Sequence, residues 1–381
     1  MKNFLALILL YFLLSLFGCR SSQSEKDNKK EVLNIIYKVN NHWQSNHPDP
    51  TTAFWHEAAY HTGNMEAFKI TGDTLFYNFS KKWAEHNEWS GATEPDTLKW
   101  KYSYGESPEY VLFGDWQICF QTYADLYNID PTPNKIARAK EVMEYEMSTP
   151  RNDYWWWADG LYMVMPVMTK LGKITNNNQY YDKLYDYWSY AKELMYDSEE
   201  NLFYRDARYV YPEHSTLSGK KDFWARGNGW VVAGLVKVLS ELPENDPHRQ
   251  EYIDTFKSMM YSIKESQHEK GYWTRSLLDE FQAPGPETSG TAFFEYAMLW
   301  GVNNGILDAK EYKFAIDKGW KYLTETALQK DGSVGYVQPI GDRAVPDQVI
   351  DATSTADFGV GAFLLAACEM ITYLQNYPLN E

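Results

Sequence analysis

The sequence predicts an all-α fold of the (α/α)6 barrel type, in which six helical hairpins close into a ring. Helical periodicity dominates the chain, and long alternating runs of β-branched residues are scarce. A rather apolar helix, a short turn and a more polar, aromatic-rich helix recur along the sequence. The first and last helices of this series lack partners, so they can pair with each other and close the ring. The alternative is an open α-solenoid, which stacks such hairpins without closure.

The repeated unit occurs five times, and each turn offers a helix stop and an Asp, Asn or Thr as a capping residue. The five copies run from Thr51 to Asn87, Asp115 to Met147, Asp159 to Tyr196, Gly227 to Gln267 and Thr288 to Leu328. The unpaired helices span Lys30 to Trp43 and Ser354 to Leu374. Since no internal linker interrupts the repeats, residues 31–381 are predicted to form one domain.

The first 18 residues are predicted to be a signal peptide rather than part of the fold. Lys2 precedes an almost wholly apolar run, and Leu16-Phe17-Gly18-Cys19 has the pattern of a bacterial lipobox. Cys19 would become the acylated N-terminus after cleavage, followed by a polar tether over residues 19–30. We therefore expect a lipoprotein anchored to a membrane of the cell envelope, facing the periplasm or the cell surface. A simple secretion signal is the alternative.

Composition narrows the classes of ligand. The net charge of −16 disfavours nucleic-acid binding, which needs a basic surface. Fifteen Trp and thirty Tyr offer flat faces on which sugars stack, although large cores also use aromatic residues. Cys119 and Cys368 lie in apolar helical runs and are interpreted as buried side chains. His56 and His61 are five residues apart, and no cysteine-rich ligand set exists, so neither a metal nor another cofactor is predicted.

Six non-periodic motifs stand immediately before predicted inner helices. The repeat implies that the inner helices run parallel, so all six motifs should meet at one rim of the ring. Helix N-termini at this rim offer free N–H groups and partial positive charge, which would allow an acidic protein to bind an acidic sugar. The motifs are Pro48–Thr51, Gly114–Gln117, Tyr154–Gly160, Trp224–Trp230, Pro286–Gly290 and Asp351–Thr355.

Asp159 is the sharpest candidate for acid–base chemistry. It follows three consecutive tryptophans and opens an apolar helix. Burial beside indoles raises the pKa of a carboxyl group, so the group can hold a proton near neutrality. Asp115, near the start of another inner helix, could raise this pKa further by like-charge repulsion or could hold the sugar. For both residues the plain alternative is a helix N-cap, and a pair of acids also fits ordinary glycoside hydrolysis.

Arg226 lies between Trp224 and Trp230 in a glycine-rich turn. Its guanidinium group offers a planar fork for a carboxylate, and the neighbouring glycines let the backbone approach a ligand. The alternative is a structural arginine that caps neighbouring carbonyl groups. Trp157 and its two tryptophan neighbours could stack on sugar rings, with packing as the alternative.

The same segments resemble those of a known family. Trp224–Trp230 and Trp157–Met163 are similar to hallmark segments of the unsaturated rhamnogalacturonyl hydrolases, glycoside hydrolase family 105, which is related to the family 88 unsaturated glucuronyl hydrolases. The resemblance extends from Asp115 to the C-terminus, with the family's segments in the family's order. The further segments are Glu287–Ala292, which makes Thr288 and Ser289 candidates for substrate binding, Trp300–Gly305, Gly335–Pro339 and Gly359–Phe363.

This resemblance implies an (α/α)6 barrel and a metal-free hydrolase. Such an enzyme removes the Δ4,5-unsaturated uronic acid, galacturonyl or glucuronyl, that a lyase leaves at the non-reducing end of an oligosaccharide. Asp159 matches the aspartate that protonates C4 and activates the water that adds at C5, and Asp115 matches a second family aspartate. Trp224, Arg226 and Trp230 match positions that line the subsite.

Two departures from the family pattern stand out. Paired aspartates are common where this chain has Asp115-Trp116. A histidine often follows a segment like Leu202–Tyr204, where this chain has Arg205, which could bind the uronic carboxylate instead. Two alternative functions therefore stay open: a conventional glycosidase acting on saturated sugars, and a lipid-anchored carbohydrate-binding protein without catalysis.

Overall fold

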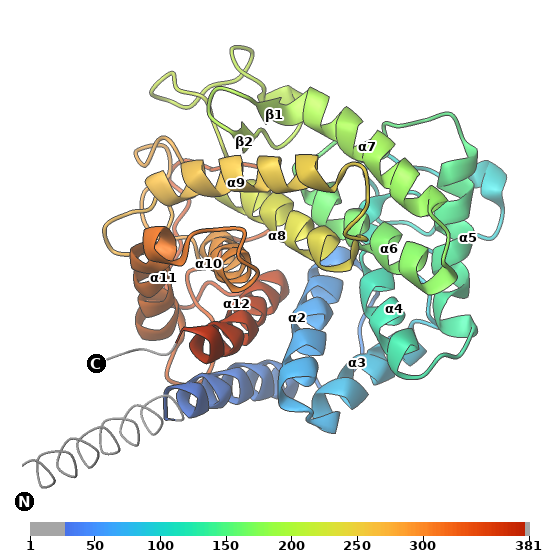
Figure 1. The fold of residues 1–381 in the computed structure, drawn as a ribbon, viewed down its shortest axis with the longest axis horizontal. Helices are drawn as coiled ribbons and strands as arrows, with labels where there is room; N and C mark the ends of the chain where they lie inside the picture. The colour runs from blue at the N-terminus through green and yellow to red at the C-terminus, as the bar shows by residue number, and fades with distance from the viewer. Residues whose placement is uncertain (1–26, 378–381) are drawn as a thin grey trace, which may run out of the picture.

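Six helices form the inner wall of a ring in the computed structural model, which describes residues 27–377 (Figure 1). Cys19 and the predicted signal peptide lie outside the described residues. Each inner helix is followed in the chain by an outer helix. The inner helices are α2 (Trp55–Thr71), α4 (Cys119–Ile129), α6 (Ala158–Thr175), α8 (Ala225–Glu241), α10 (Thr288–Asn303) and α12 (Asp357–Asn376).

The ring is closed, because each inner helix packs against the next and α12 packs against α2. Two glycines allow this last contact. A Cβ atom on Gly63 of α2 would lie 2.4 Å from the carbonyl oxygen of Gly361, and one on Gly361 would lie 2.4 Å from that of Ala59. The helix backbones therefore touch directly. The predicted (α/α)6 barrel is confirmed, and the open solenoid is excluded.

The outer helices cover the inner ring, and a helix over residues 27–46 supplies the partner that α12 lacks. In this helix Asn40 donates to Asn64 of α2 at 2.7 Å, and the Trp43 indole donates to Asp357 of α12 at 3.0 Å. Residues 27–30, which were expected in the tether, already belong to this helix. The other outer helices are α3 (Thr74–His86), α5 (Asn134–Ser148), α7 (Gln179–Met195), α9 (Arg249–Glu265) and α11 (Ala309–Tyr322).

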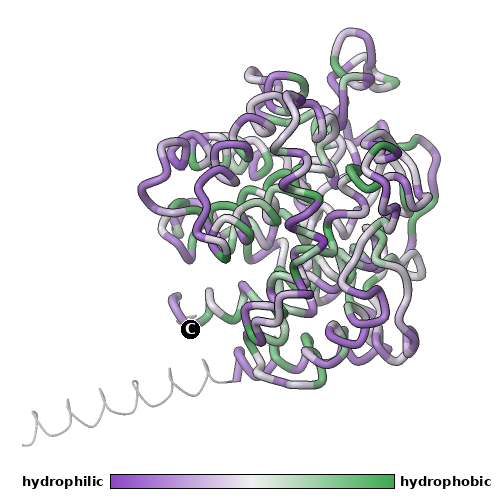
Figure 2. The backbone as a smooth tube through the Cα atoms, turned by 90° about the vertical axis from the view of Figure 1, so that its right-hand side faces the viewer, coloured by the Kyte–Doolittle hydropathy of each residue, from purple (hydrophilic) through white to green (hydrophobic). Residues whose placement is uncertain are grey.

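The apolar core lies within and between the two layers of helices, and hydrophilic stretches lie at the periphery (Figure 2). Cys119 and Cys368 are free and buried, as predicted. Within residues 27–377, α12 is the one helix long and apolar enough to span a membrane. However, 83% of its most apolar window is buried in the protein, as expected of a core helix.

Side-chain capping is less regular than the sequence suggested. Asp73 and Asp308 accept hydrogen bonds from the first turns of α3 and α11, and Glu287 does so for α10. Outer helices α5, α7 and α9 begin without a side-chain cap. A short hairpin of β1 (Tyr196–Asp197) and β2 (Leu202–Phe203) follows α7 and leads into one of the irregular segments that build the rim.

Candidate active site

A cavity of about 710 Å³ opens at the rim where the inner helices begin. Most of its lining comes from the starts of inner helices and from the segments that precede them, at the rim where the six sequence motifs were expected to meet. Its lining includes three carboxyl groups, those of Asp115, Asp159 and Asp342, and two arginines, Arg205 and Arg208. The residues that line the cavity are Trp55, Ser103, Tyr104, Asp115, Trp156, Trp157, Asp159, Met163, Arg205, Arg208, Ile340, Gly341 and Asp342.

Asp159 is the second residue of α6, and its side chain is 12% exposed. The N-cap position belongs to Trp157 and has no side-chain cap, so the plain interpretation of Asp159 as a cap is wrong. Its Oδ2 atom has no hydrogen-bond partner among residues 27–377. Burial raises the pKa of Asp159, while the guanidinium groups of Arg205 and Arg226 oppose that rise. The geometry therefore suits a carboxyl group that holds and releases a proton.

Asp115 lies in a short 3-10 turn, η2 (Gly114–Trp116), and not at the N-terminus of α4 itself. Its side chain does not cap either helix. Burial raises the pKa of Asp115 well above its usual value, and the nearby charge of Asp159 raises it further. Two buried acids that repel each other in this way favour a state in which at least one carries a proton.

Trp157 packs between the two segments that carry Asp115 and Asp159. Its ring stacks on Phe113 with the centroids 4.9 Å apart. A Cβ atom on Gly114 or Gly160 would come within 3.1 Å of the same ring. A larger residue at either glycine would press on the indole, and the close packing joins the turn bearing Asp115 to the helix bearing Asp159. Trp157 lines the cavity, as predicted, but most of its surface is used in packing.

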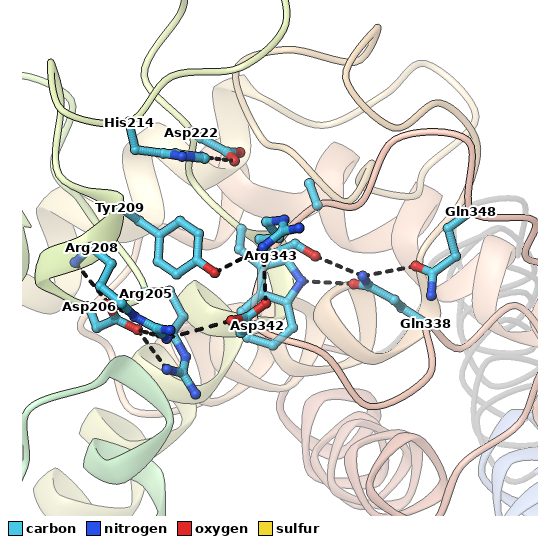
Figure 3. A network of polar contacts seen from close by, with 12 residues as sticks. Arg205, Asp206, Arg208, Tyr209, His214, Asp222, Gln338, Asp342, Arg343 and Gln348 are labelled. Carbon is cyan, nitrogen blue, oxygen red and sulfur yellow. Dashed lines mark hydrogen bonds and ion pairs between the residues drawn. The ribbon is translucent and has the colours of Figure 1, made fainter. Parts of the chain in front are cut away.

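Arg205 supplies the positive charge that faces the acids. Its Nε atom lies 3.5 Å from Oδ2 of Asp159, and its guanidinium group stands 5.7 Å from the Trp156 ring centroid. Arg205 also donates to the buried Asp206 at 2.6 Å. Arg208 donates to the same carboxylate through Nε and Nη2, each at 2.9 Å (Figure 3). The cation next to Asp159 is thus held in place by a second carboxylate.

Asp206 remains charged despite its burial. Burial opposes ionisation, but hydrogen bonds from Arg208 and Arg205 lower the pKa of Asp206 below its usual value. Arg208 is 63% exposed and also approaches Asp342, with 3.5 Å between Nη2 and Oδ2. The pair links the segment after β2 to the segment before α12 across one side of the cavity.

The structure does not bring Arg226 to the cavity wall. Arg226 is 1% exposed, and its guanidinium group donates to the carbonyl oxygens of Gln338 at 2.7 Å and Pro339 at 2.9 Å. The Trp224 and Phe358 rings flank it, with centroids 4.5 and 4.6 Å away. The structural interpretation of this arginine therefore describes the geometry better than direct binding of the sugar.

Four other predicted binding residues are also buried in packing. Trp224 donates to Gln338, and Trp230 packs inside the ring against Phe293 at 4.5 Å. Thr288 and Ser289 are fully buried, and they bond to the hydroxyl of Tyr322 and to the carboxylate of Glu287. None of these side chains lines the cavity.

Several residues of the cavity escaped the sequence analysis. Arg208 lies in a single 3-10 turn, η3 (Ala207–Tyr209), and Ile340 and Asp342 lie in an irregular segment. The exposed Tyr104 comes from a long loop before η2. In the sequence, these residues are marked only by their closeness to residues already singled out. Asp342 follows the Gly335–Pro339 segment by three residues, and Arg208 follows Arg205 by three.

One group among residues 27–377 has the side chains of a metal site. The donor atoms of His56, Glu57 and Asp357 all lie within 4.8 Å of one another, outside the cavity lining. His56 already pairs with Asp357 at 3.1 Å. His61, the other histidine considered from the sequence, is buried and bonds to Ser80. The geometry is that of an ion pair between α2 and α12.

A closed six-hairpin ring with two buried acids in a cavity at its mouth is the arrangement expected of a glycoside hydrolase of the (α/α)6 class. The sequence model of Glycosyl Hydrolase Family 88 matches residues 20–374, so this chain belongs to that family. The predicted relation to the unsaturated uronyl hydrolase families is confirmed. Membership supports a hydrolase over a binding protein without catalysis.

Three relatives illustrate the similarity. An "Unsaturated 3S-rhamnoglycuronyl hydrolase" from Formosa agariphila is 36% identical over 346 residues, which are 86% of this chain and 88% of that protein. The solved structure of a glycosyl hydrolase family 88 protein from Bacteroides vulgatus is 56% identical with a TM-score of 0.89, covering 91% and 99% of the two chains. A solved structure named as a polysaccharide lyase is 62% identical with a TM-score of 0.91, covering 93% and 100%.

Proposed function

We propose that this hydrolase removes a Δ4,5-unsaturated uronyl residue from the non-reducing end of a lyase-generated oligosaccharide, with Asp159 as the acid and base. The observation that carries the proposal is the contact between Asp159 and Arg205. A buried carboxyl group of raised pKa lies beside a fixed guanidinium group at the floor of a cavity large enough for a sugar. Arg205 would hold the uronic carboxylate, and this would place C4 and C5 of the sugar next to Asp159.

The reaction consumes one water molecule. The proton of Asp159 moves to C4, and positive charge develops at C5 beside the ring oxygen. The Asp159 carboxylate then takes a proton from water, and the remaining hydroxide bonds to C5. The product is a hemiketal, which opens to a ketone at C5 and leaves a hemiacetal at C1. That hemiacetal collapses to an aldehyde and releases the neighbouring sugar with a free hydroxyl group. Asp159 ends protonated, ready for the next cycle.

The direct test uses the ultraviolet absorbance of the double bond conjugated to the carboxylate. Purified protein should abolish this absorbance in lyase digests of at least one acidic polysaccharide and should release the neighbouring sugar in equal amount. The panel should include pectic, arabinogalactan, ulvan and glycosaminoglycan digests. Absorbance that persists across the whole panel would reject the proposal. Release of saturated sugars instead would identify a conventional glycosidase.

A second candidate reaction is elimination, because the 62% identical structure is named as a polysaccharide lyase. A lyase would create the conjugated double bond, so absorbance would rise with an intact polysaccharide. The hydrolase reaction lowers absorbance and acts only after a lyase has cut. The two reactions therefore give opposite signs in one assay, with intact and digested polysaccharide as its two arms.

The name of the Formosa agariphila relative favours rhamnose as the sugar next to the bond. We propose ulvan-type digests, in which rhamnose follows the unsaturated uronyl end, as the first substrates to test. Equal rates on digests without rhamnose would remove this preference while leaving the reaction type intact.

We also propose that the protein is anchored in the cell envelope through Cys19, and the sequence pattern around Gly18 supports this. The test is incorporation of labelled fatty acid into the full-length chain expressed in a bacterial host. Cys19→Ser should abolish labelling and release the protein from membranes. Labelling that survives this substitution would reject the anchor.

A further inference from the structure

The buried Arg226 contacts the backbone of one segment that reaches the cavity. Its Nη1 and Nη2 atoms donate to consecutive carbonyl oxygens, those of Gln338 and Pro339, and Nη1 also lies 3.5 Å from the hydroxyl oxygen of Ser289. The next three residues, Ile340, Gly341 and Asp342, line the cavity. Pro339, which the guanidinium group contacts, thus directly precedes the part of the cavity wall that a bound sugar would touch.

Gln338 joins this segment to several parts of the rim. Its side-chain oxygen accepts from the Trp224 indole at 2.8 Å, and its backbone N–H donates to Glu287 at 3.1 Å. Its amide nitrogen donates to the Arg343 carbonyl at 2.9 Å and to Gln348 at 3.1 Å (Figure 3). The start of α8, the start of α10 and the segment 338–348 therefore form one bonded unit.

Arg226 is a buried cation, so its guanidinium group needs partners that compensate for the loss of water. Two carbonyl oxygens and two flanking aromatic faces supply them. Arg226 does not line the cavity, whereas Arg205 does and lies against Asp159. The cation that faces the reacting carboxyl group and the cation that fixes the wall are two different residues.

We propose that Arg226 is a positioning residue that fixes segment 338–342 as the wall against which the sugar rests, and that it does not itself bind the uronic carboxylate. The kinetic part of this inference rests on the proposed function, and the structural part does not. A displaced wall would misplace the sugar relative to Asp159, and a shift of 1 Å can cost about 100-fold in rate.

The first experiment needs no substrate. Hydrogen exchange of the full chain is compared between the native protein and Arg226→Met, Arg226→Lys and Gln338→Ala, after thermal melts show that each variant is folded. We expect faster exchange in peptides covering residues 337–343 for Arg226→Met and Gln338→Ala, and a smaller effect for Arg226→Lys, which retains one donor group. Unchanged exchange in this segment for a folded Arg226→Met would overturn the proposal.

The second experiment separates positioning from direct binding. Kinetics are measured on an unsaturated oligosaccharide with a free carboxylate and on its methyl ester. Relative to the native protein, Arg205→Met should lose much more activity on the free acid than on the ester, because the ester has no charge to bind. Arg226→Met should lose kcat/KM by about 10- to 100-fold on both substrates alike.

The combination of Arg226→Met with Gln338→Ala provides the control. If both changes act through the same segment, the double variant should lose little more than the worse single variant. A loss in Arg226→Met that disappears on the methyl ester would show direct carboxylate binding, and a loss that multiplies fully with that of Gln338→Ala would show that the two residues act independently. Either outcome would reject the proposal. If no substrate is turned over at all, the proposed function fails, while hydrogen exchange still decides the role of Arg226.

Discussion

The Nε atom of Arg205 lies 3.5 Å from Oδ2 of Asp159, and among the described residues neither atom has a hydrogen-bond partner. Both groups are largely buried, so the contact is shielded from water and its electrostatic effect is strong. Two opposing effects therefore act on Asp159. Burial raises its pKa, and the neighbouring guanidinium group restrains that rise. This balance gives the carboxyl group a proton that it can both donate and recover.

The pH profile should depend on this balance. Asp159 must be protonated to donate, so kcat/KM should fall as pH rises through the pKa of Asp159. Arg205→Met removes a charge that favours the carboxylate, so the pKa of Asp159 should rise. We expect the alkaline limb of the kcat/KM profile to move to higher pH, with a lower maximum. Arg205→Lys, which retains the charge, is the matched control and should leave the limb near its native position. A limb that moves to lower pH in Arg205→Met would contradict this assignment.

Asp159→Asn should retain binding and lose turnover. The amide has nearly the same shape as the carboxyl group, but it cannot deliver a proton to carbon. The expected loss in kcat is about 100- to 10,000-fold, the usual range for removal of a general acid. Calorimetry with an unsaturated oligosaccharide should still detect binding. Full turnover in this variant would remove Asp159 from the mechanism.

The sequence predicted the ring because its signals are local and repeated. Apolar periodicity, turn residues and the two unpaired end helices all describe neighbours in the chain. The acids became candidates for the same reason, since only Ala158 separates Asp159 from three consecutive tryptophans and Asp115 stands beside a repeat boundary. The expectation that both acids share one rim then followed from helix direction alone, and both line the same cavity.

The direction of individual side chains could not be predicted in this way. Arg226 lies in the first turn of α8, whereas Arg205 lies two residues after β2, and both have aromatic neighbours in the sequence. Only the folded chain shows that the first turns toward the carbonyl groups of residues 338 and 339 while the second turns toward Asp159. These partners are distant in sequence and lie in segments without periodicity, so no local pattern encodes them.

Stability should respond to pH through Glu146, which is fully buried on the outer helix α5. Burial raises the pKa of Glu146 to about 8, and a hydrogen bond from Gln117 only partly offsets this effect. An unfolded chain ionises this group above its ordinary pKa of 4.5, whereas the folded protein must keep it protonated. The folded state should therefore lose stability as pH rises from about 4.5 toward 8.

Glu146→Gln removes this penalty and retains an oxygen for Gln117. Its gain in unfolding free energy should be small at pH 5 and should reach about 3 kcal/mol at most near pH 7. Urea unfolding at both pH values measures the difference. Glu141→Gln, at an exposed position on the same helix, is the control and should show no such pH dependence. A gain for Glu146→Gln that is equal at both pH values would argue against a protonated group.

Ring closure should be sensitive to a single methyl group at Gly361. Alanine at this position gains about 1 kcal/mol from helix propensity, but its Cβ atom would meet the carbonyl oxygen of Ala59 at 2.4 Å. That oxygen belongs to the backbone of α2 and cannot rotate away, so the two helices must separate. We expect a net loss of about 1–3 kcal/mol in unfolding free energy, measured by denaturant unfolding. Gly341→Ala, where the nearest atom would lie at 3.7 Å, should cost far less. Equal stability of the two variants would mean that α2 and α12 do not touch through their backbones, and the closed ring would need a different explanation.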